Sequence, residues 1–157
     1  MVHLIGVGNH IVQHDARAQV QLALDERAAF DAQVAELIAT NDFTLLAEEF
    51  SDEAREKAHA SATILQLFAK GKGIDHLFCD PDLSERKELG VEEGDDDKRE
   101  QVWLERIEAY KGRNILFVCG DKHFDSFAGK LTAAGFEVQR GLRTRHISRE
   151  QLWWRGE

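Results

Sequence analysis

The sequence predicts a single α/β domain with three layers, in which helices cover both faces of a mainly parallel sheet of about five strands. Short apolar runs typical of strands alternate with longer segments of helical periodicity, and this alternation is the pattern of βαβ units. The chain has 157 residues, enough for one domain with its own core, and only one proline. We therefore expect residues 1–157 to form one domain.

The first predicted strand covers residues 2–7, which are apolar apart from one histidine and one glycine. Residues 16–39 are rich in alanine, leucine and glutamine, and one long helix, or two with a break near Asp25, is expected there. The predicted inner face of this segment consists of Val20, Leu24, Val34, Leu37 and Ile38. Residues 43–50 form the second predicted strand.

One helix is predicted after Ser51, which is a good N-cap, and Asp52 and Glu53 suit the positive end of its dipole. Its apolar stripe comprises Ala54, Ala58, Ala62, Leu65 and Phe68, and two nearby glycines stop it. Residues 74–79 form the third predicted strand because they are mostly apolar. A short helix is expected over residues 83–89.

The acidic residues 92–97 are predicted to form a solvated loop, with a cation site as the less favoured alternative. Residues 98–110 then form a helix, with Trp103, Ile107 and Tyr110 facing inward. The four bulky apolar residues 115–118 are typical of a strand buried on both faces. A helix follows over residues 124–134, and residues 136–139 alternate in polarity like an edge strand.

Composition excludes several functional classes. The net charge is −9, which argues against a sequence-independent grip on nucleic acid or on an anionic membrane. No apolar run approaches the ~20 residues of a membrane helix, and the first residues do not resemble a signal peptide. We therefore expect a cytoplasmic protein, in which Cys79 and Cys119 are free, buried thiols.

The last segment, residues 141–157, is predicted to be a tail rich in arginine and tryptophan. Trp153 and Trp154 would be exposed there unless they pack against something. We expect them to dock on the domain or on a second subunit, which would make a homodimer through the tail.

Polar residues follow four of the predicted strands, at the edge where ligands bind in open α/β sheets. In chain order they are Asn9, His10, His14, Glu48, Glu49, Asp80, Asp82, Arg86, Asp121 and His123. Imidazole and carboxylate are common ligands of Zn, Mn and Fe, and such a metal activates water. The same residues have structural alternatives as helix caps, turn formers or surface histidines.

The common sequence motifs for nucleotide binding and for a catalytic serine are incomplete or absent, so they do not account for the polar residues at this edge. The Gly-x-Gly-x-x-Gly fingerprint is incomplete because position 11 is Ile. The sequence has neither a Walker phosphate loop nor a Gly-x-Ser-x-Gly elbow.

Three short motifs resemble the superfamily that includes the TraB, TIKI, erythromycin esterase and ChaN-like proteins. They are Gly6-Val7-Gly8-Asn9-His10, Glu48 at the end of the second strand, and Gly120-Asp121-Lys122-His123. His14 is similar to a further histidine of ChaN-like members, and Arg86 to the basic residue of the family. The resemblance implies a hydrolase. Some members depend on metal and some bind haem.

The chain also departs from that superfamily. Val7-Gly8-Asn9 replaces the acidic residue that many members have in the first motif, and the chain is much shorter than the enzymes with known substrates. The resemblance therefore implies no substrate class.

Our leading hypothesis is a small cytosolic hydrolase, metal-dependent or metal-free, that acts on a small molecule or a peptide. Glu48, His123 and Arg86 are the predicted catalytic residues: Glu48 or the metal activates water, and Arg86 binds an anionic group. The predicted ligands of a Zn, Mn or Fe ion are His10, Glu48, His123 and Asp80, with His14 and Asp121 as second choices.

Two other hypotheses remain open from the sequence. One is a non-catalytic α/β module that binds a ligand or a protein at the same edge. The other is a Mg²⁺-dependent phosphatase or nuclease that uses Asp80, Asp82 and Asp121.

Overall fold

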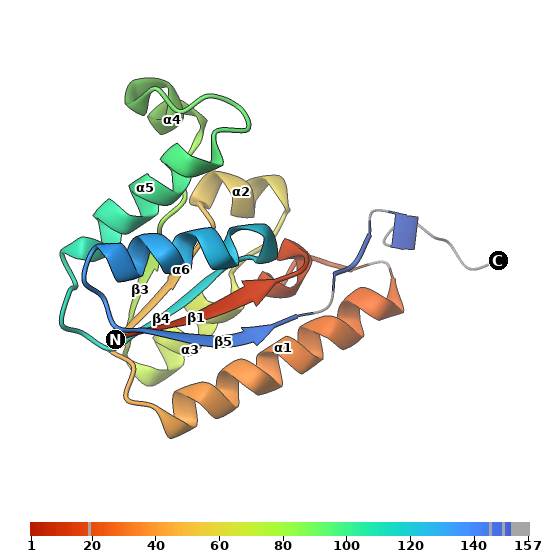
Figure 1. The fold of residues 1–157 in the computed structure, drawn as a ribbon. Coiled ribbons are helices and arrows are strands. Elements are labelled where there is room, and N and C mark those ends of the chain that lie inside the picture. Colours follow the sequence, from red (N-terminus) through yellow and green to blue (C-terminus); the bar gives the residue numbers. More distant parts are fainter. Residues whose placement is uncertain (19, 145, 149, 152–157) are drawn as a thin grey trace.

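The computed structural model describes residues 1–157 except 19, 145, 149 and 152–157, and it has the predicted α/β architecture (Figure 1). In the described residues five strands form one sheet, all neighbours are parallel, and the order is β3-β2-β4-β1-β5. The strands are β1 Val2–Val7, β2 Leu45–Glu48, β3 Asp75–Phe78, β4 Ile115–Gly120 and β5 Val138–Arg143. The predicted fold class is confirmed.

Helices connect these strands on both sides of the sheet. They are the 3-10 helices η1 His10–Gln13 and η2 Asp121–His123, and the α-helices α1 Gln21–Thr40, α2 Asp52–Lys57, α3 Ile64–Lys72, α4 Leu83–Leu89, α5 Asp96–Glu108 and α6 Phe124–Ala133. In the part of the chain that the structure describes, no helix is long and apolar enough to cross a membrane.

Each face of the sheet has its own apolar core because successive strand residues point to opposite faces. Figure 1 shows α5 and α6 above the sheet, with α1 and α3 below it. In β4, Phe117 packs with Trp103 of α5 and Phe127 of α6, whereas Val118 belongs to the lower core with Phe30 of α1. All six residues of β4 are buried, as predicted for a central strand.

The segment after β1 differs from the prediction. The predicted helix over residues 16–39 begins only at Gln21, and of its predicted inner face Leu24 is exposed and Val20 precedes the helix. Upstream, the Asp15 carboxylate accepts hydrogen bonds from the backbone N–H groups of Ser61 and Ala62, at 2.8 and 3.0 Å. These contacts tie the segment to the rest of the domain in a non-helical conformation.

The single helix predicted after Ser51 is instead two helices, α2 and α3. The chain leaves α2 through His59, which has a positive φ of 55°, and Thr63 starts α3. Thr63 and Gln66 form a reciprocal capping box, which is a strong helix start signal. The acidic loop is also shorter than predicted, because Asp95 caps α5 and Asp96 belongs to its first turn.

The predicted edge strand at residues 136–139 extends over residues 138–143, so Arg143 belongs to β5 and not to a tail. Beyond it, the Thr144 backbone N–H donates to the Gly6 carbonyl at 2.8 Å, and Ile147 is buried. Trp153 and Trp154 lie outside the described residues, so their docking stays a prediction.

Both cysteines are free and fully buried, as predicted. Cys119 is in β4, Cys79 follows β3, and β2 lies between those strands. Burial raises the pKa of both thiols well above the usual range, which leaves them protonated and unsuited to nucleophilic attack.

Candidate active site at the carboxyl edge of the sheet

A pocket of about 300 Å³ opens at the carboxyl edge of the sheet, where the strand arrows of Figure 1 point. Its lining combines five polar side chains with three apolar ones, and consists of His10, His14, Glu49, Phe50, Ala54, Ala58, Asp80 and Arg99. These residues come from segments that follow β1, β2 and β3, and from α5. This is the edge that the sequence predicts for the site.

Glu49 is one of the polar residues of this lining and is almost completely buried. Its carboxylate accepts a hydrogen bond from the Gly120 backbone N–H at 2.6 Å and another from Arg99 Nη2 at 2.8 Å. A Cβ atom at position 120 would lie 3.2 Å from Glu49 Oε2 and 3.3 Å from His10 Nε2. The glycine at the end of β4 therefore gives both side chains their space.

Two histidines approach the same oxygen of Glu49. His10 Nε2 lies 3.8 Å from Glu49 Oε1, and His123 Nε2 lies 3.5 Å from it. The His10 side chain is 44% exposed and lines the pocket, whereas that of His123 is 1% exposed. His10 is thus the imidazole that an incoming molecule meets, and His123 lies behind Glu49.

His123 is held by a second buried carboxylate. Its Nδ1 donates to Glu100 Oε1 at 2.8 Å, and Glu100 Oε2 accepts from Ser126 Oγ at 2.7 Å and from Lys130 Nζ at 2.8 Å. The indole of Trp103 packs edge-on against the imidazole, with 4.8 Å between ring centroids. Nε2 of His123 has no hydrogen-bond partner among the described residues and is aimed at Glu49.

Glu48, predicted to be both catalyst and ligand, is directed away from this pocket. It is fully buried and accepts hydrogen bonds from Gln13 Nε2 at 3.0 Å, Thr63 Oγ1 at 2.5 Å and His76 Nε2 at 2.7 Å. Because Glu48 and Glu49 are adjacent in an extended segment, their side chains point to opposite faces. Glu49 is the one that reaches the pocket.

Asp80 and Arg86 were predicted as a metal ligand and an anion-binding residue, and the structure pairs them with each other. Asp80 Oδ2 accepts from Arg86 Nη2 at 2.8 Å, and Oδ1 accepts from Arg99 Nε and Trp103 Nε1, both at 3.0 Å. The guanidinium of Arg86 therefore already binds a carboxylate and also donates to the Pro81 carbonyl.

Arg99 is a site residue that the sequence reasoning missed. Its side chain is 14% exposed and pairs with both Glu49 and Asp80. Burial alone lowers its pKa, but the hydrogen bonds and charges of Asp80 and Glu49 outweigh burial and raise the pKa above its usual value. One signal in the sequence was available. A positive charge in the first turn of a helix is unfavourable because this is the positive end of the helix dipole, so an arginine at that position indicates a compensating interaction with a carboxylate.

His14 lines the pocket as a neutral imidazole. Burial, followed by the positive charge of Arg27, lowers its pKa to about 4. Its Nδ1 accepts a hydrogen bond from the Ala16 backbone N–H at 3.3 Å, and the buried ring packs against Phe50.

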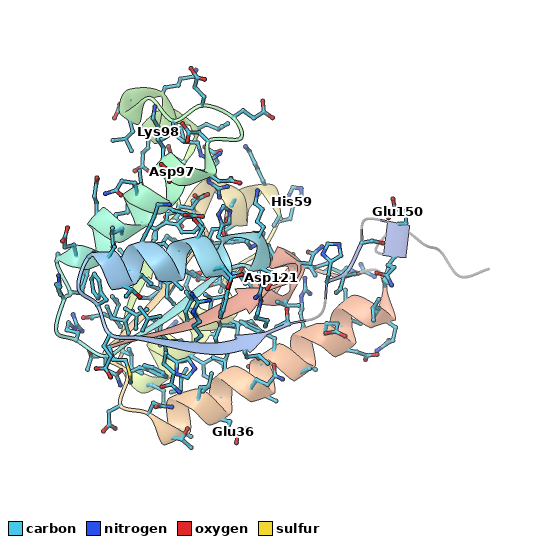
Figure 2. All side chains as sticks on the ribbon, viewed as in Figure 1. Glu36, His59, Asp97, Lys98, Asp121 and Glu150 are labelled. Atoms are coloured by element: carbon cyan, nitrogen blue, oxygen red, sulfur yellow. The ribbon has the colours of Figure 1, made fainter. Side chains whose placement is uncertain are left out.

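The carboxylates of the predicted Mg²⁺ site are not gathered at one place. Asp82 caps α4 by accepting from the Glu85 backbone N–H at 2.9 Å, and Asp121 pairs with Arg143 at 2.5 Å. Figure 2 shows Asp121 beside the tip of the β1 arrow. Asp80 is bound by its two arginines, so the geometry does not favour a phosphatase or nuclease built on these three residues.

The predicted metal ligands are likewise divided between environments, because Glu48 faces Gln13 and Asp80 faces arginines. Among the described residues, no group of three or more His, Cys, Asp or Glu side chains is placed to hold a metal ion. The four predicted ligands are therefore not gathered around one point, and a bound Zn, Mn or Fe ion stays a prediction that elemental analysis would test.

Comparison of the chain with family models, curated proteins and solved structures finds no match. The resemblance to the TraB, TIKI, erythromycin esterase and ChaN-like superfamily therefore stays a prediction that rests on its short motifs.

Proposed function

We propose that the pocket is the active site of a small hydrolase that cleaves an ester or amide by general-base catalysis. The observation that carries this proposal is the position of His10: its Nε2 faces a buried carboxylate, Glu49, while its ring remains open to the pocket. Imidazole is the most common general base in proteins, and a neighbouring carboxylate stabilises the imidazolium that forms. A cytoplasmic location is part of the same proposal.

In this mechanism His10 Nε2 removes a proton from a water molecule as the water oxygen attacks the carbonyl carbon of the substrate. The bond to the leaving group then breaks, and the leaving group departs with the proton that His10 received. Glu49 Oε1, 3.8 Å from Nε2, stabilises the transient imidazolium.

Arg99 is the donor proposed to stabilise the charge that develops on the substrate oxygen. A guanidinium has five N–H groups. Asp80, Glu49 and Asp96 accept from three different nitrogens of Arg99, at 3.0, 2.8 and 3.5 Å. Two N–H groups therefore remain for a substrate oxygen in the pocket that Arg99 lines.

The size of the pocket favours a small substrate. A volume of about 300 Å³ is at the lower end of ligand sites, and the apolar lining comes from Phe50, Ala54 and Ala58. We expect short acyl groups to be preferred over long peptides.

A panel of chromogenic short-chain esters and anilides tests the proposal, with His10→Asn and His59→Asn as matched variants. Asn at position 10 keeps a donor near the place of Nδ1 but removes Nε2. His59 is exposed and lies beside α2 (Figure 2), and asparagine tolerates its positive φ. We expect His10→Asn to lower the rate about a hundredfold or more, and His59→Asn to leave it unchanged.

Equal rates for the wild type and His10→Asn on every hydrolysed substrate would contradict the proposal. Saturable binding of a panel compound at the pocket without turnover would favour the non-catalytic binding module.

A further inference from the structure

His10 is connected to Glu48 through a hydrogen-bonded chain that runs through the side-chain amide of Gln13. His10 Nδ1 lies 2.5 Å from Gln13 Oε1, and Gln13 Nε2 lies 3.0 Å from Glu48 Oε2. Gln13 and Glu48 are both completely buried. We propose that Glu48 is a positioning residue that fixes the tautomer of His10 through Gln13.

The Gln13 amide has its orientation set by Glu48. A carboxylate has acceptors only, so the group of Gln13 that faces Glu48 must be its NH₂. The carbonyl oxygen of the same amide then faces His10. The direction of the amide is therefore set by the charge of Glu48, and not by His10.

The tautomer of His10 follows from the orientation of this amide. Because Gln13 Oε1 can only accept, the proton of a neutral imidazole must be on Nδ1. Nε2 then carries the lone pair, and Nε2 is the nitrogen that faces Glu49 and the pocket. The opposite tautomer would place an N–H where the base is needed.

Glu48 is itself held rigidly in the sheet. It is the last residue of β2, which lies between β3 and β4. Thr63 and His76 donate to its other oxygen, at 2.5 and 2.7 Å. A carboxylate fixed by backbone and side-chain contacts has little freedom to release Gln13. The consequence for catalysis rests on the proposed function, whereas the tautomer does not.

The test is ¹⁵N NMR of the histidine side chains at about pH 8.5, above the ordinary pKa of histidine near 6.5. These spectra distinguish a protonated from an unprotonated ring nitrogen. We expect wild-type His10 to be a single form with its proton on Nδ1. Glu48→Gln should lose that single form, because an amide at position 48 also donates and allows Gln13 to turn over. Hydrolysis by Glu48→Gln should fall about twofold or more, because molecules with the proton on Nε2 lack the base.

Glu100→Gln is the matched control, because it makes the same change beside a different histidine, the buried His123. It should alter the signals of His123 and leave those of His10 unchanged. Should Glu48→Gln fail to fold, Gln13→Met breaks the same chain from its middle and should have the same effect on His10.

A wild-type His10 with its proton on Nε2 would overturn the inference. A Glu48→Gln or Gln13→Met protein that folds and keeps the single Nδ1–H form would overturn it as well. A confirmed tautomer effect in a protein that hydrolyses no substrate would contradict the proposed function and leave Glu48 as the residue that positions His10.

Discussion

Arg99 lies between two carboxylates with little solvent exposure, Glu49 and Asp80, and donates to both. Removal of one partner from such a cluster leaves uncompensated charge in a poorly hydrated place. We therefore expect Arg99→Met to lower the free energy of unfolding by about 3–5 kcal/mol in urea titrations. Arg140→Met is the control, because Arg140 pairs with Asp125 at the surface and such pairs contribute about 0–1 kcal/mol. Equal losses for the two variants would contradict the assigned role.

His14 makes stability depend on pH. Its pKa is about 4 in the folded protein, chiefly because of burial and then Arg27, compared with 6.5 as the ordinary value. Between these pH values the unfolded chain binds more protons, so the free energy of unfolding decreases as the pH falls from about 7 to about 4. The decrease attributable to His14 reaches about 3 kcal/mol. His14→Gln should remove this part of the slope, and an unchanged slope in urea titrations at each pH would refute the assignment.

At the residue scale the sequence predicted the edge but not the orientation of its side chains. The Glu48-Glu49 pair shows why. Side chains alternate along a strand, so the two residues are expected to point to opposite faces of the sheet. Which of these faces holds the pocket depends on helices that lie far along the chain. Arg99 was missed for a related reason, since it belongs to α5 and reaches the site only through packing. His10 and His123 were predicted as candidate site residues because each lies within three residues of the end of a buried strand.

Thr63 connects helix α3 to the buried carboxylate of Glu48, because it is the N-cap of α3 and its hydroxyl also donates to Glu48. Thr63→Ala should lower the free energy of unfolding by about 1–3 kcal/mol, since a lost N-cap costs about 1 kcal/mol and a buried acceptor loses a donor. Thr63→Ser keeps the hydroxyl and should cost less. Thermal and urea unfolding measure both variants, and a Ser variant as unstable as the Ala variant would contradict the role of the hydroxyl.

At the element scale, strands were easier to predict than helix ends. β1 and β4 are marked by buried apolar runs and were placed almost to the residue. The division of α2 from α3 was missed because Ala58 and Ala62 continue a helical stripe, although the Thr-x-x-Gln capping signal at Thr63 was present. The start of α1 depends on the contact of Asp15 with residues distant in sequence, which local periodicity does not contain.

At the scale of the whole molecule, the sheet places β2, β4 and β1 in its interior and β3 and β5 at its edges. The alternation of elements predicted the layers, but the order of the strands follows from long-range packing. This order brings the ends of β2 and β4 side by side, which allows Gly120 at the end of β4 to donate its backbone N–H to Glu49 just after β2. The position of Glu49 in the pocket therefore depends on the order of the strands in the sheet.

The most direct test of the central claim is the rate of ester hydrolysis by wild type and His10→Asn after dialysis against a strong chelator, with metal content verified. We predict that wild type keeps its rate and that the variant is slower by about a hundredfold or more. A wild-type rate that disappears with the metal and returns with added Zn, Mn or Fe would contradict the claim, as would equal rates for the two proteins.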